Sequence, residues 1–189
     1  MQLLASLLLA FTSTALAAPA ASQAEPRAPE VANGFYLTTA NADGTITRTP
    51  INDPSDLANL EGVSVFSRRA PEKPTLALGK RYVSCWGRQL DTYGTDKAVN
   101  QWKSYLATNI LELHSTSSTY SVQYANDGVA VYYCINAKNS VGSLNLEDFN
   151  YALRQMDARC RAYEASYFQW DGSPEIVGKA SVNDRVCLG

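Results

Sequence analysis

The strand pattern of this chain is clearest in residues 119–135, which read TYSVQYANDGVAVYYCI. Aromatic or aliphatic residues alternate with polar ones up to Ala125, as in a half-buried strand. The next three residues, Asn126-Asp127-Gly128, are typical of a tight hairpin turn. The run that follows, 129–135, is apolar throughout, which indicates a central strand covered on both faces. We therefore expect an antiparallel hairpin near the middle of a sheet.

Two amphipathic helices are expected on either side of this hairpin in the sequence. The first spans about 96–107, where apolar residues including Trp102 recur every three to four positions behind Thr95 as an N-cap. The second spans 146–160, behind a capping-box variant that begins at Asn145. Each helix has one apolar stripe and therefore needs a sheet face to cover it.

Further strand-like runs lie at 82–86, 165–170 and 175–179, and the last two flank a Gly-Ser-Pro turn. The element order over 82–189 is then β-α-β-β-α-β-β, which contains the split βαβ arrangement. The sequence therefore predicts an α+β sandwich, stabilised by disulfides, with both helices on one face of a mainly antiparallel sheet.

The amino-terminal residues predict export from the cell. An apolar run from Leu3 to Phe11 precedes Ala15-Leu16-Ala17, the small-x-small pattern that signal peptidase accepts. We expect a signal peptide over 1–17, cleaved after Ala17, and a secreted, extracellular protein. No other apolar run approaches the roughly 18 residues of a membrane span, so no span is expected.

Residues 18–81 contain no cysteine and are predicted to form an N-terminal arm or propeptide. The arm begins with an Ala/Pro/Glu-rich linker, and Asp43-Gly44 within it marks a plausible hairpin. Two dibasic pairs, ending at Arg69 and Arg81, resemble sites for the kexin-type protease of the late secretory pathway. We therefore expect processing there, with a disulfide-containing domain over 82–189.

Secretion makes disulfides the expected state of the four cysteines, Cys85, Cys134, Cys160 and Cys187, because the extracellular space is oxidising. Four cysteines allow three pairings, and the sequence alone leaves all three open. The combination of Cys85–Cys187 with Cys134–Cys160 is favoured because its first bond closes the longest loop. In the chain-entropy model such a loop contributes about 4 kcal/mol.

Composition excludes several classes of function. The chain carries 16 basic and 18 acidic side chains, a net charge of −2, and it has no basic stripe of the kind that nucleic-acid binders show. One histidine and no CxxC spacing leave no basis for a metal site. No nucleic-acid partner, metal or cofactor is therefore expected.

The element order from Gly128 to Lys179 resembles that of the fungal killer-toxin-like and necrosis-inducing effector domains. In those domains a strand ending near a cysteine leads through an Asn/Gly/Ser loop into a helix that ends at another cysteine, and a strand closes the unit. The corresponding segments here are 129–134, 136–145, 146–160 and 163–170. The whole chain is also similar to small secreted cysteine-containing proteins of filamentous ascomycetes. The resemblance implies an effector-like or toxin-like protein with a role in virulence.

His114 is the first candidate for catalysis, with Glu112 and Ser115 beside it in the sequence. Nucleophilic catalysis needs a base that is oriented by a third group, and no Gly-x-Ser-x-Gly turn is present. Residues 82–85 also resemble the Tyr-x-Cys start of ribonuclease-like mildew effectors. Ribonuclease catalysis generally needs a second histidine, or a glutamate and an arginine beside the first. A solvated loop histidine is the simpler interpretation.

Paired carboxylates could hydrolyse a glycoside if a cleft separated them by roughly 5–9.5 Å. The nearest pairs in the sequence are Asp91 with Asp96 and Glu147 with Asp148. Asp96 and Asp148 are already explained by helix starts, and Asp91 is better interpreted as part of a turn. We therefore assign no catalytic residue, and a small hydrolase, ribonuclease-like or glycosidase-like, stays the alternative function.

Aromatic residues near the C-terminus provide a candidate binding surface, made of Tyr163, Tyr167, Phe168 and Trp170. Side chains alternate along a strand, so Tyr163 and Tyr167 are expected opposite Phe168 and Trp170. One of the two faces could be an exposed aromatic patch for a protein or a glycan. The sequence thus favours a secreted interaction protein that acts on a host or competitor target.

Overall fold

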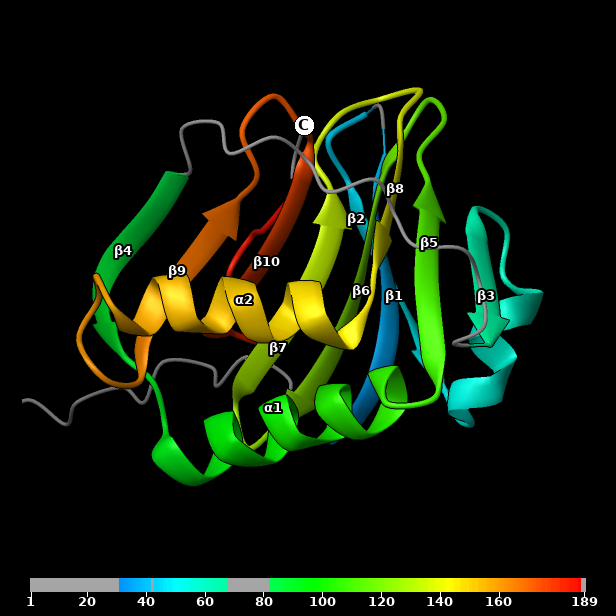
Figure 1. Ribbon diagram of the computed structural model, residues 1–189. Coiled ribbons are helices and arrows are strands. Elements are labelled where there is room, and N and C mark those ends of the chain that lie inside the picture. Colours follow the sequence, from blue (N-terminus) through cyan, green and yellow to red (C-terminus); the bar gives the residue numbers. More distant parts are fainter. Residues whose placement is uncertain (1–30, 42, 68–81, 188–189) are drawn as a thin grey trace, which may run out of the picture.

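A seven-stranded sheet is the framework of the protein (Figure 1), seen in a computed structural model that describes residues 31–41, 43–67 and 82–187. The strand order is β2-β1-β6-β7-β10-β9-β4, and every neighbouring pair is antiparallel. The strands are β1 (Gly34–Ala40), β2 (Ile46–Ile51), β4 (Tyr82–Gln89), β6 (Thr119–Asn126), β7 (Val129–Ile135), β9 (Glu164–Gln169) and β10 (Glu175–Ser181). The central strand is β7, as its apolar run predicted.

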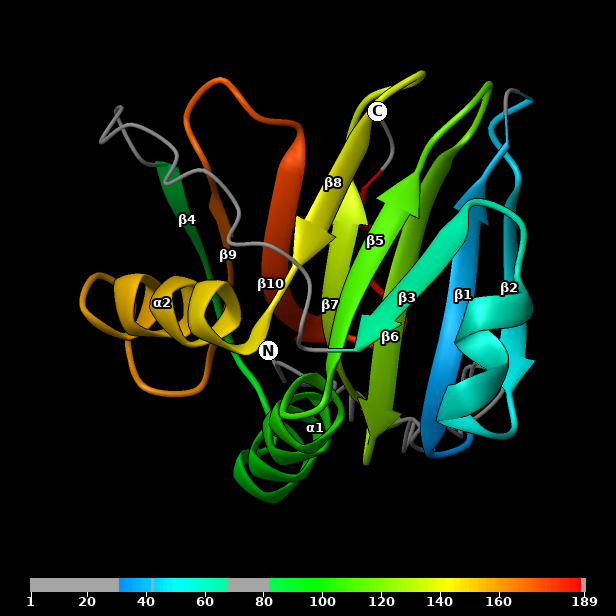
Figure 2. The same cartoon turned by 45° about the vertical axis from the view of Figure 1, so that its right-hand side comes forward.

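A second layer covers one face of this sheet, which we call the helix face. It contains α1 (Thr92–Leu106), α2 (Leu146–Asp157) and a three-stranded sheet of β3 (Val63–Ser67), β5 (Asn109–His114) and β8 (Val141–Leu144). Figure 2 shows both helices and the small sheet on the same side of the seven strands. A 3-10 helix, Pro54–Asn59, precedes β3. The predicted α+β class and the placement of both helices on one face are confirmed.

The main core fills the space between these layers around Trp102, which is fully buried. Its ring stacks on Phe149 of α2, with centroids 5.9 Å apart, and meets the edge of Phe35 from β1 at 5.6 Å. The indole Nε1 donates a hydrogen bond to the carbonyl oxygen of Val131 at 2.8 Å. Trp102 therefore joins both helices to the sheet, and its predicted core position is confirmed.

The hairpin of β6 and β7 closes through a type I′ turn. Asp127 and Gly128 both have positive φ, 44° and 78°, which suits the right-handed twist of the flanking strands. Every residue of β7 is buried. The predicted turn and the two-sided cover of this strand are confirmed.

The start of α2 was predicted correctly, whereas the start of α1 was not. Asn145 caps α2, and its side chain accepts a hydrogen bond from the Asp148 N–H at 2.9 Å, as expected. Helix α1 instead begins at Thr92 because Asp91 is its N-cap, accepting from the Gly94 N–H at 2.6 Å. The predicted Thr95 cap was wrong. Thr95 lies one turn inside the helix, where its hydroxyl donates to the Asp91 carbonyl oxygen.

Three strands were not predicted from the sequence, β3, β5 and β8. The side chains of β5 alternate, with Leu111 and Leu113 in the core and Glu112 and His114 outward. Strand β8 is only four residues long and contains a glycine. Strand β5 lies between β3 and β8 and pairs with both in the small sheet, so the order after α1 is β-β-β-β-α-β-β.

The described part of the expected N-terminal arm, residues 31–67, contributes strands to both sheets. The hairpin predicted around Asp43-Gly44 is formed by β1 and β2. Strand β1 lies between β2 and β6, and its Phe35 and Leu37 enter the main core. The predicted signal peptide and both dibasic pairs lie outside the described residues.

The cysteines are all paired, but not as favoured from the sequence. Cys85 bonds to Cys160, with Cα atoms 5.5 Å apart, and Cys134 bonds to Cys187, at 6.3 Å. The favoured pairing was wrong because side chains alternate along β7. Tyr133 points into the core on the helix face, whereas Cys134 packs on the opposite face. Cys160 follows α2 on the helix face, so the sheet separates it from Cys134.

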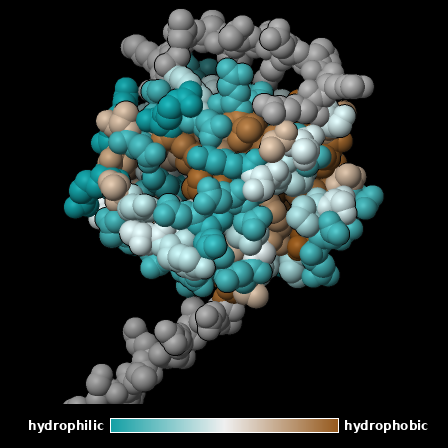
Figure 3. Space-filling model, turned by 60° about the horizontal axis from the view of Figure 1, so that its bottom comes forward, coloured by the Kyte–Doolittle hydropathy of each residue, from teal (hydrophilic) through white to brown (hydrophobic). Residues whose placement is uncertain are grey.

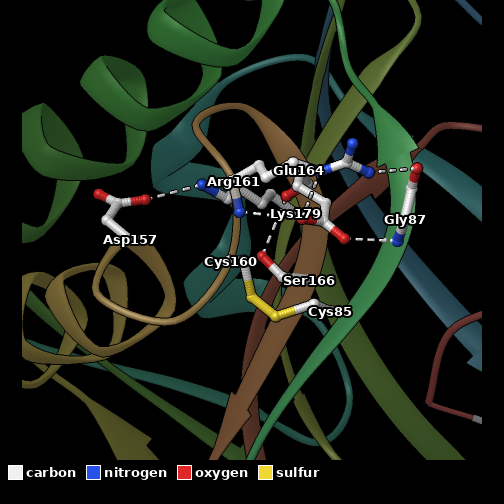
Figure 4. Close-up of a disulfide and its surroundings, with 8 residues drawn as sticks. All are labelled: Cys85, Gly87, Asp157, Cys160, Arg161, Glu164, Ser166 and Lys179. Carbon is white, nitrogen blue, oxygen red and sulfur yellow. Dashed lines mark hydrogen bonds and ion pairs between the residues drawn. A yellow bond between two sulfur atoms is a disulfide. The ribbon is translucent and has the colours of Figure 1, made fainter.

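The bond between Cys85 and Cys160 lies beside a buried carboxylate, Glu164 (Figure 4). The Glu164 oxygens accept hydrogen bonds from the backbone N–H groups of Arg161 and Gly87. These two bonds hold the pKa of Glu164 below its ordinary value. The carboxylate thus fastens the loop after α2 to the edge strand β4.

Candidate binding site

Three aromatic rings lie together on the face of the large sheet opposite the helices, which we call the back face. Tyr82 and Trp86 come from edge strand β4, and Tyr167 comes from the adjacent strand β9. The Tyr167 ring centroid is 5.7 Å from that of Tyr82 and 6.1 Å from that of Trp86, with interplanar angles of 52° and 69°. Tyr82 is 55% exposed. The three rings, tilted against one another, therefore form a continuous surface at one edge of the sheet, which we call the aromatic wall.

This wall borders a hollow of about 220 Å³, which we call the back groove. Its opposite wall is made by Arg185, Val186 and Cys187, which belong to the chain segment 182–187 after β10. The back groove is lined by Trp86, Tyr132, Asn136, Tyr167, Ile176, Arg185, Val186 and Cys187. A mainly apolar and aromatic lining with a few polar groups, here those of Asn136 and Arg185, is the usual composition of a ligand site.

The segment 182–187 is held in place by contacts along its length. Cys187 is bonded to Cys134, and its carbonyl oxygen accepts from the Thr119 hydroxyl at 2.7 Å. Arg185 donates to the Gly44 carbonyl oxygen at 3.2 Å. The groove wall is thus fixed to the turn of the β1–β2 hairpin, to β6 and to β7.

The tyrosines of the back groove stay protonated at physiological pH. Burial, followed by the nearby Tyr82 hydroxyl, raises the pKa of Tyr167. Burial is also the main cause that raises the pKa of Tyr132. Both phenols are therefore neutral hydrogen-bonding groups, which suits a neutral polar ligand better than a cation.

The structure separates the four aromatic residues that the sequence singled out. Tyr167 lies in the back groove, whereas Phe168 is fully buried in the core and Trp170 packs against it. Tyr163 precedes β9 and has positive φ, 57°, so strand alternation does not govern its direction. Its hydroxyl lies 3.4 Å from an Asp96 carboxylate oxygen of α1, on the helix face.

Sequence reasoning missed Tyr82 and Trp86 as members of this surface. Their spacing of four within a strand places them on one face, and that was the available signal. Their proximity to Tyr167 depends on the pairing of β4 with β9, in which Ser84 lies opposite Tyr167. That register joins segments more than 80 residues apart and is not visible in the sequence.

A second and larger hollow, about 610 Å³, lies between α1 and α2 and is called here the helix groove. It is lined by Thr95, Asp96, Val99, Lys103, Asn150, Leu153, Arg154, Asp157, Ala162, Tyr163 and Lys179. The floor residue Lys179 belongs to β10, and its side chain is only 5% exposed. Its Nζ is 2.9 Å from a carboxylate oxygen of Asp157 (Figure 4).

The candidate catalytic histidine has an acid partner but lies outside both grooves. His114 ends β5, and its Nε2 is 2.7 Å from a carboxylate oxygen of Glu112, two residues earlier on the outward face. Within the part of the chain that the structure describes, Glu112 is its only side-chain hydrogen-bond partner. The neighbouring Ser115 hydroxyl instead donates to the carbonyl oxygens of Ala137 and Ser140.

Of the four carboxylates considered for glycoside hydrolysis, three have structural partners, and Glu147 lies in the first turn of α2. Asp91 caps α1, and Asp148 lies beside the cap of α2, where its carboxylate accepts from the Asn145 amide. Asp96 lies beside the Tyr163 hydroxyl. No group of three or more potential metal ligands occurs among residues 31–41, 43–67 and 82–187.

Among the described residues, no helix is both long enough and apolar enough to cross a membrane. In comparisons with known proteins, the chain matches no family model, no curated protein and no solved structure.

Proposed function

We propose that this protein acts outside the cell as a non-enzymatic interaction protein, effector-like or toxin-like, that binds a glycan on a host or competitor cell through the back groove. The observation that carries the proposal is the aromatic wall of Tyr82, Tyr167 and Trp86 facing the polar groups of the opposite wall. The predicted signal peptide supports the extracellular location, and the two disulfides suit an oxidising compartment.

A glycan fits the back groove on chemical grounds. The ring faces carry partial negative charge, which attracts the polarised C–H groups on the flat side of a pyranose. Arg185 of the opposite wall supplies donors for sugar hydroxyls, and the side-chain amide of Asn136, which follows β7, is a further polar group of the lining. Because the rings are tilted against one another, they match successive sugar units of a chain better than one flat surface.

The test is titration calorimetry of the purified protein with chitohexaose, cellohexaose and laminarihexaose. We expect at least one oligosaccharide to bind, and we expect Trp86→Ala and Tyr167→Ala each to weaken that binding by about tenfold, equivalent to about 1.4 kcal/mol. Tyr93→Ala is the matched control, because Tyr93 is 60% exposed on α1, away from the groove. Circular dichroism checks that each variant is folded.

Two outcomes overturn the proposal. One is the absence of binding to all three oligosaccharides at millimolar concentration. The other is binding that Trp86→Ala and Tyr167→Ala leave unchanged. Capture of a protein partner through these same rings would also replace the glycan in the proposal.

The alternative, a small hydrolase, has one supporting observation, the 2.7 Å contact between His114 and Glu112. This contact could orient a general base. The assay is release of products from RNA and from the three oligosaccharides, compared between wild type and His114→Ala. Turnover that disappears in the variant would favour the hydrolase over the binding protein.

A further inference from the structure

The helix groove is independent of the back groove, since the seven-stranded sheet lies between them. Its walls are the facing sides of α1 and α2, and its floor is β10. A volume of about 610 Å³ lies within the range of small-molecule sites, roughly 300–1,000 Å³. In Figure 3, which brings the α1 end of the molecule forward, the surface is mostly hydrophilic and hydrophobic residues form small separate patches. The groove lining itself includes five charged side chains, those of Asp96, Lys103, Arg154, Asp157 and Lys179, so the groove suits a polar ligand.

Lys179 is an unusual residue for the floor of this groove. It lies in β10 between β7 and β9, opposite Val131 and Ser166, and the side chain is 5% exposed. Burying an ammonium group is costly unless its three N–H donors have acceptors. In the described part of the chain, Asp157 is its single hydrogen-bond partner, at 2.9 Å. Two donors thus remain for whatever occupies the groove.

The groove walls add two more cations. Lys103 projects from α1 and Arg154 from α2, and both line the groove. Across the described residues, neither has a carboxylate within ion-pair distance; the guanidinium of Arg154 lies 5.9 Å from the Tyr151 ring centroid. The three cations Lys103, Arg154 and Lys179 therefore come from three different elements and surround one opening.

The two acidic residues of the groove offset part of this positive charge. Asp157 accepts from Lys179, and Asp96 lies near the Tyr163 hydroxyl at 3.4 Å. With three cations and two anions, the lining has a net charge of +1. An oxyanion placed over Lys179 would accept its remaining N–H donors and pair with Lys103 and Arg154.

We propose that the helix groove binds a small organic molecule that carries an oxyanion, a carboxylate or a phosphate, on the ammonium group of Lys179. The remaining lining, which includes Val99, Leu153 and the Asn150 side chain, contacts the uncharged part of the ligand. This site goes beyond the proposed glycan binding and does not rest on it.

The experiment titrates the folded protein with citrate, with glucose 6-phosphate and with glucose, followed by calorimetry and by NMR shifts of residues in α1 and α2. Citrate and glucose 6-phosphate distinguish a carboxylate from a phosphate ligand, and glucose is the neutral counterpart of the phosphate. We expect saturable binding of at least one of the two anions and none of glucose in this groove. Added salt is expected to weaken the binding.

Substitutions then locate the site. Lys179→Met keeps an unbranched side chain that is one atom shorter and removes its charge, and we expect it to weaken anion binding by about tenfold or more. Lys103→Gln and Arg154→Gln alter side chains at the groove walls and test the site independently of the buried position. The matched control is Lys97→Met, because Lys97 lies on the exposed side of α1 beside Tyr93.

The proposal is overturned if neither anion binds at millimolar concentration, or if glucose binds as well as glucose 6-phosphate. It is also overturned if Lys103→Gln and Arg154→Gln bind the anion as tightly as the Lys97→Met control. A loss of oligosaccharide binding in the back-groove variants leaves these results unaffected, so the two proposals fail separately.

Discussion

Cys134 holds Cys187 against the back face of the sheet, and through it the chain segment that forms one wall of the back groove. Cys134 itself is fully buried in the central strand. The other disulfide, Cys85–Cys160, instead ties the edge strand β4 to the chain after α2 on the helix face. The two bonds therefore stabilise different faces of one sheet.

Removing either disulfide is expected to lower the free energy of unfolding by a similar amount but to release different parts of the chain. The bonded cysteines are 53 and 75 positions apart, and for loops of that length the chain-entropy model gives about 4 kcal/mol each. Urea denaturation of the two paired Cys→Ser variants measures this loss. Hydrogen exchange should rise over 182–187 in the Cys134/Cys187 variant alone. Equal exchange of that segment in both variants would contradict its anchoring by Cys187.

Gly178→Ala is expected to destabilise the fold by about 1–3 kcal/mol, as overpacking does in a tight core. A Cβ added to Gly178 of β10 meets the ring end of Tyr132, whose side chain is buried. Thermal unfolding measures the effect. Adding Tyr132→Leu to Gly178→Ala should recover part of the loss, whereas two independent effects would simply add.

Trp102→Phe is expected to cost about 2–4 kcal/mol. The smaller ring leaves a cavity beside Phe149, and the buried Val131 carbonyl loses the hydrogen bond from the indole. Urea denaturation again provides the measurement. A surface aromatic variant, Tyr93→Phe, is the control and should change the free energy of unfolding by less than about 0.5 kcal/mol.

Glu164→Gln is expected to lower stability in a pH-dependent way. Hydrogen bonds from the Arg161 and Gly87 N–H groups lower the pKa of Glu164, so its charged form stabilises the folded state. The contribution of the charged carboxylate to stability is fully present above pH 4.5, the ordinary pKa of a glutamate. It is lost as the pH falls through the lower pKa that Glu164 has in the folded state. Denaturation from pH 7 to pH 3 should show the gap between wild type and variant narrowing below about pH 4.5. A gap that stays constant would disprove the role of the charge.

Cutting at the dibasic pairs is expected to leave a two-chain protein. The predicted sites lie between β3 and β4, and all four cysteines belong to 82–187, so no disulfide joins residues 31–67 to the rest of the described chain. Strand pairing, core contacts and side-chain hydrogen bonds hold them in place. After treatment with a purified kexin-type protease, both chains should elute together in size exclusion and separate in urea. Elution of the 31–67 chain alone in native buffer would contradict this.

Local signals in the sequence predicted local structure well. The turn at Asp127-Gly128 and the cap at Asn145 each depend on a few neighbouring residues, and both are present. Helix α1 was shifted because Asp91 and Thr95 are both good caps, one turn apart. The choice of Asp91 lets Gly94 pack closely on the Asn126 carbonyl, a tertiary contact that no local pattern shows.

Features that depend on distant pairing were not predictable. The disulfide partners follow from which face each cysteine occupies, and the back groove follows from the register of β4 against β9. The alternation of Leu111 and Leu113 with Glu112 and His114 in β5 was visible in the sequence, but we interpreted this segment as a loop around His114. The candidate site therefore shares only Tyr167 with the aromatic residues expected from the sequence.

The position of β1 between β2 and β6 also has a consequence for biosynthesis. Thr38 of β1 receives a hydrogen bond from Gln123 of β6, 85 positions later in the chain. At roughly 5–20 residues per second, a ribosome needs about 4–17 seconds to make that interval. During this time the inner edge of the first hairpin has no strand to pair with, and such non-local pairing is slow to form. Strand β1 is thus among the first to be synthesised, but its pairing with β6 is among the last to form. Its unpaired edge is therefore exposed to chaperones and to misassembly for longer.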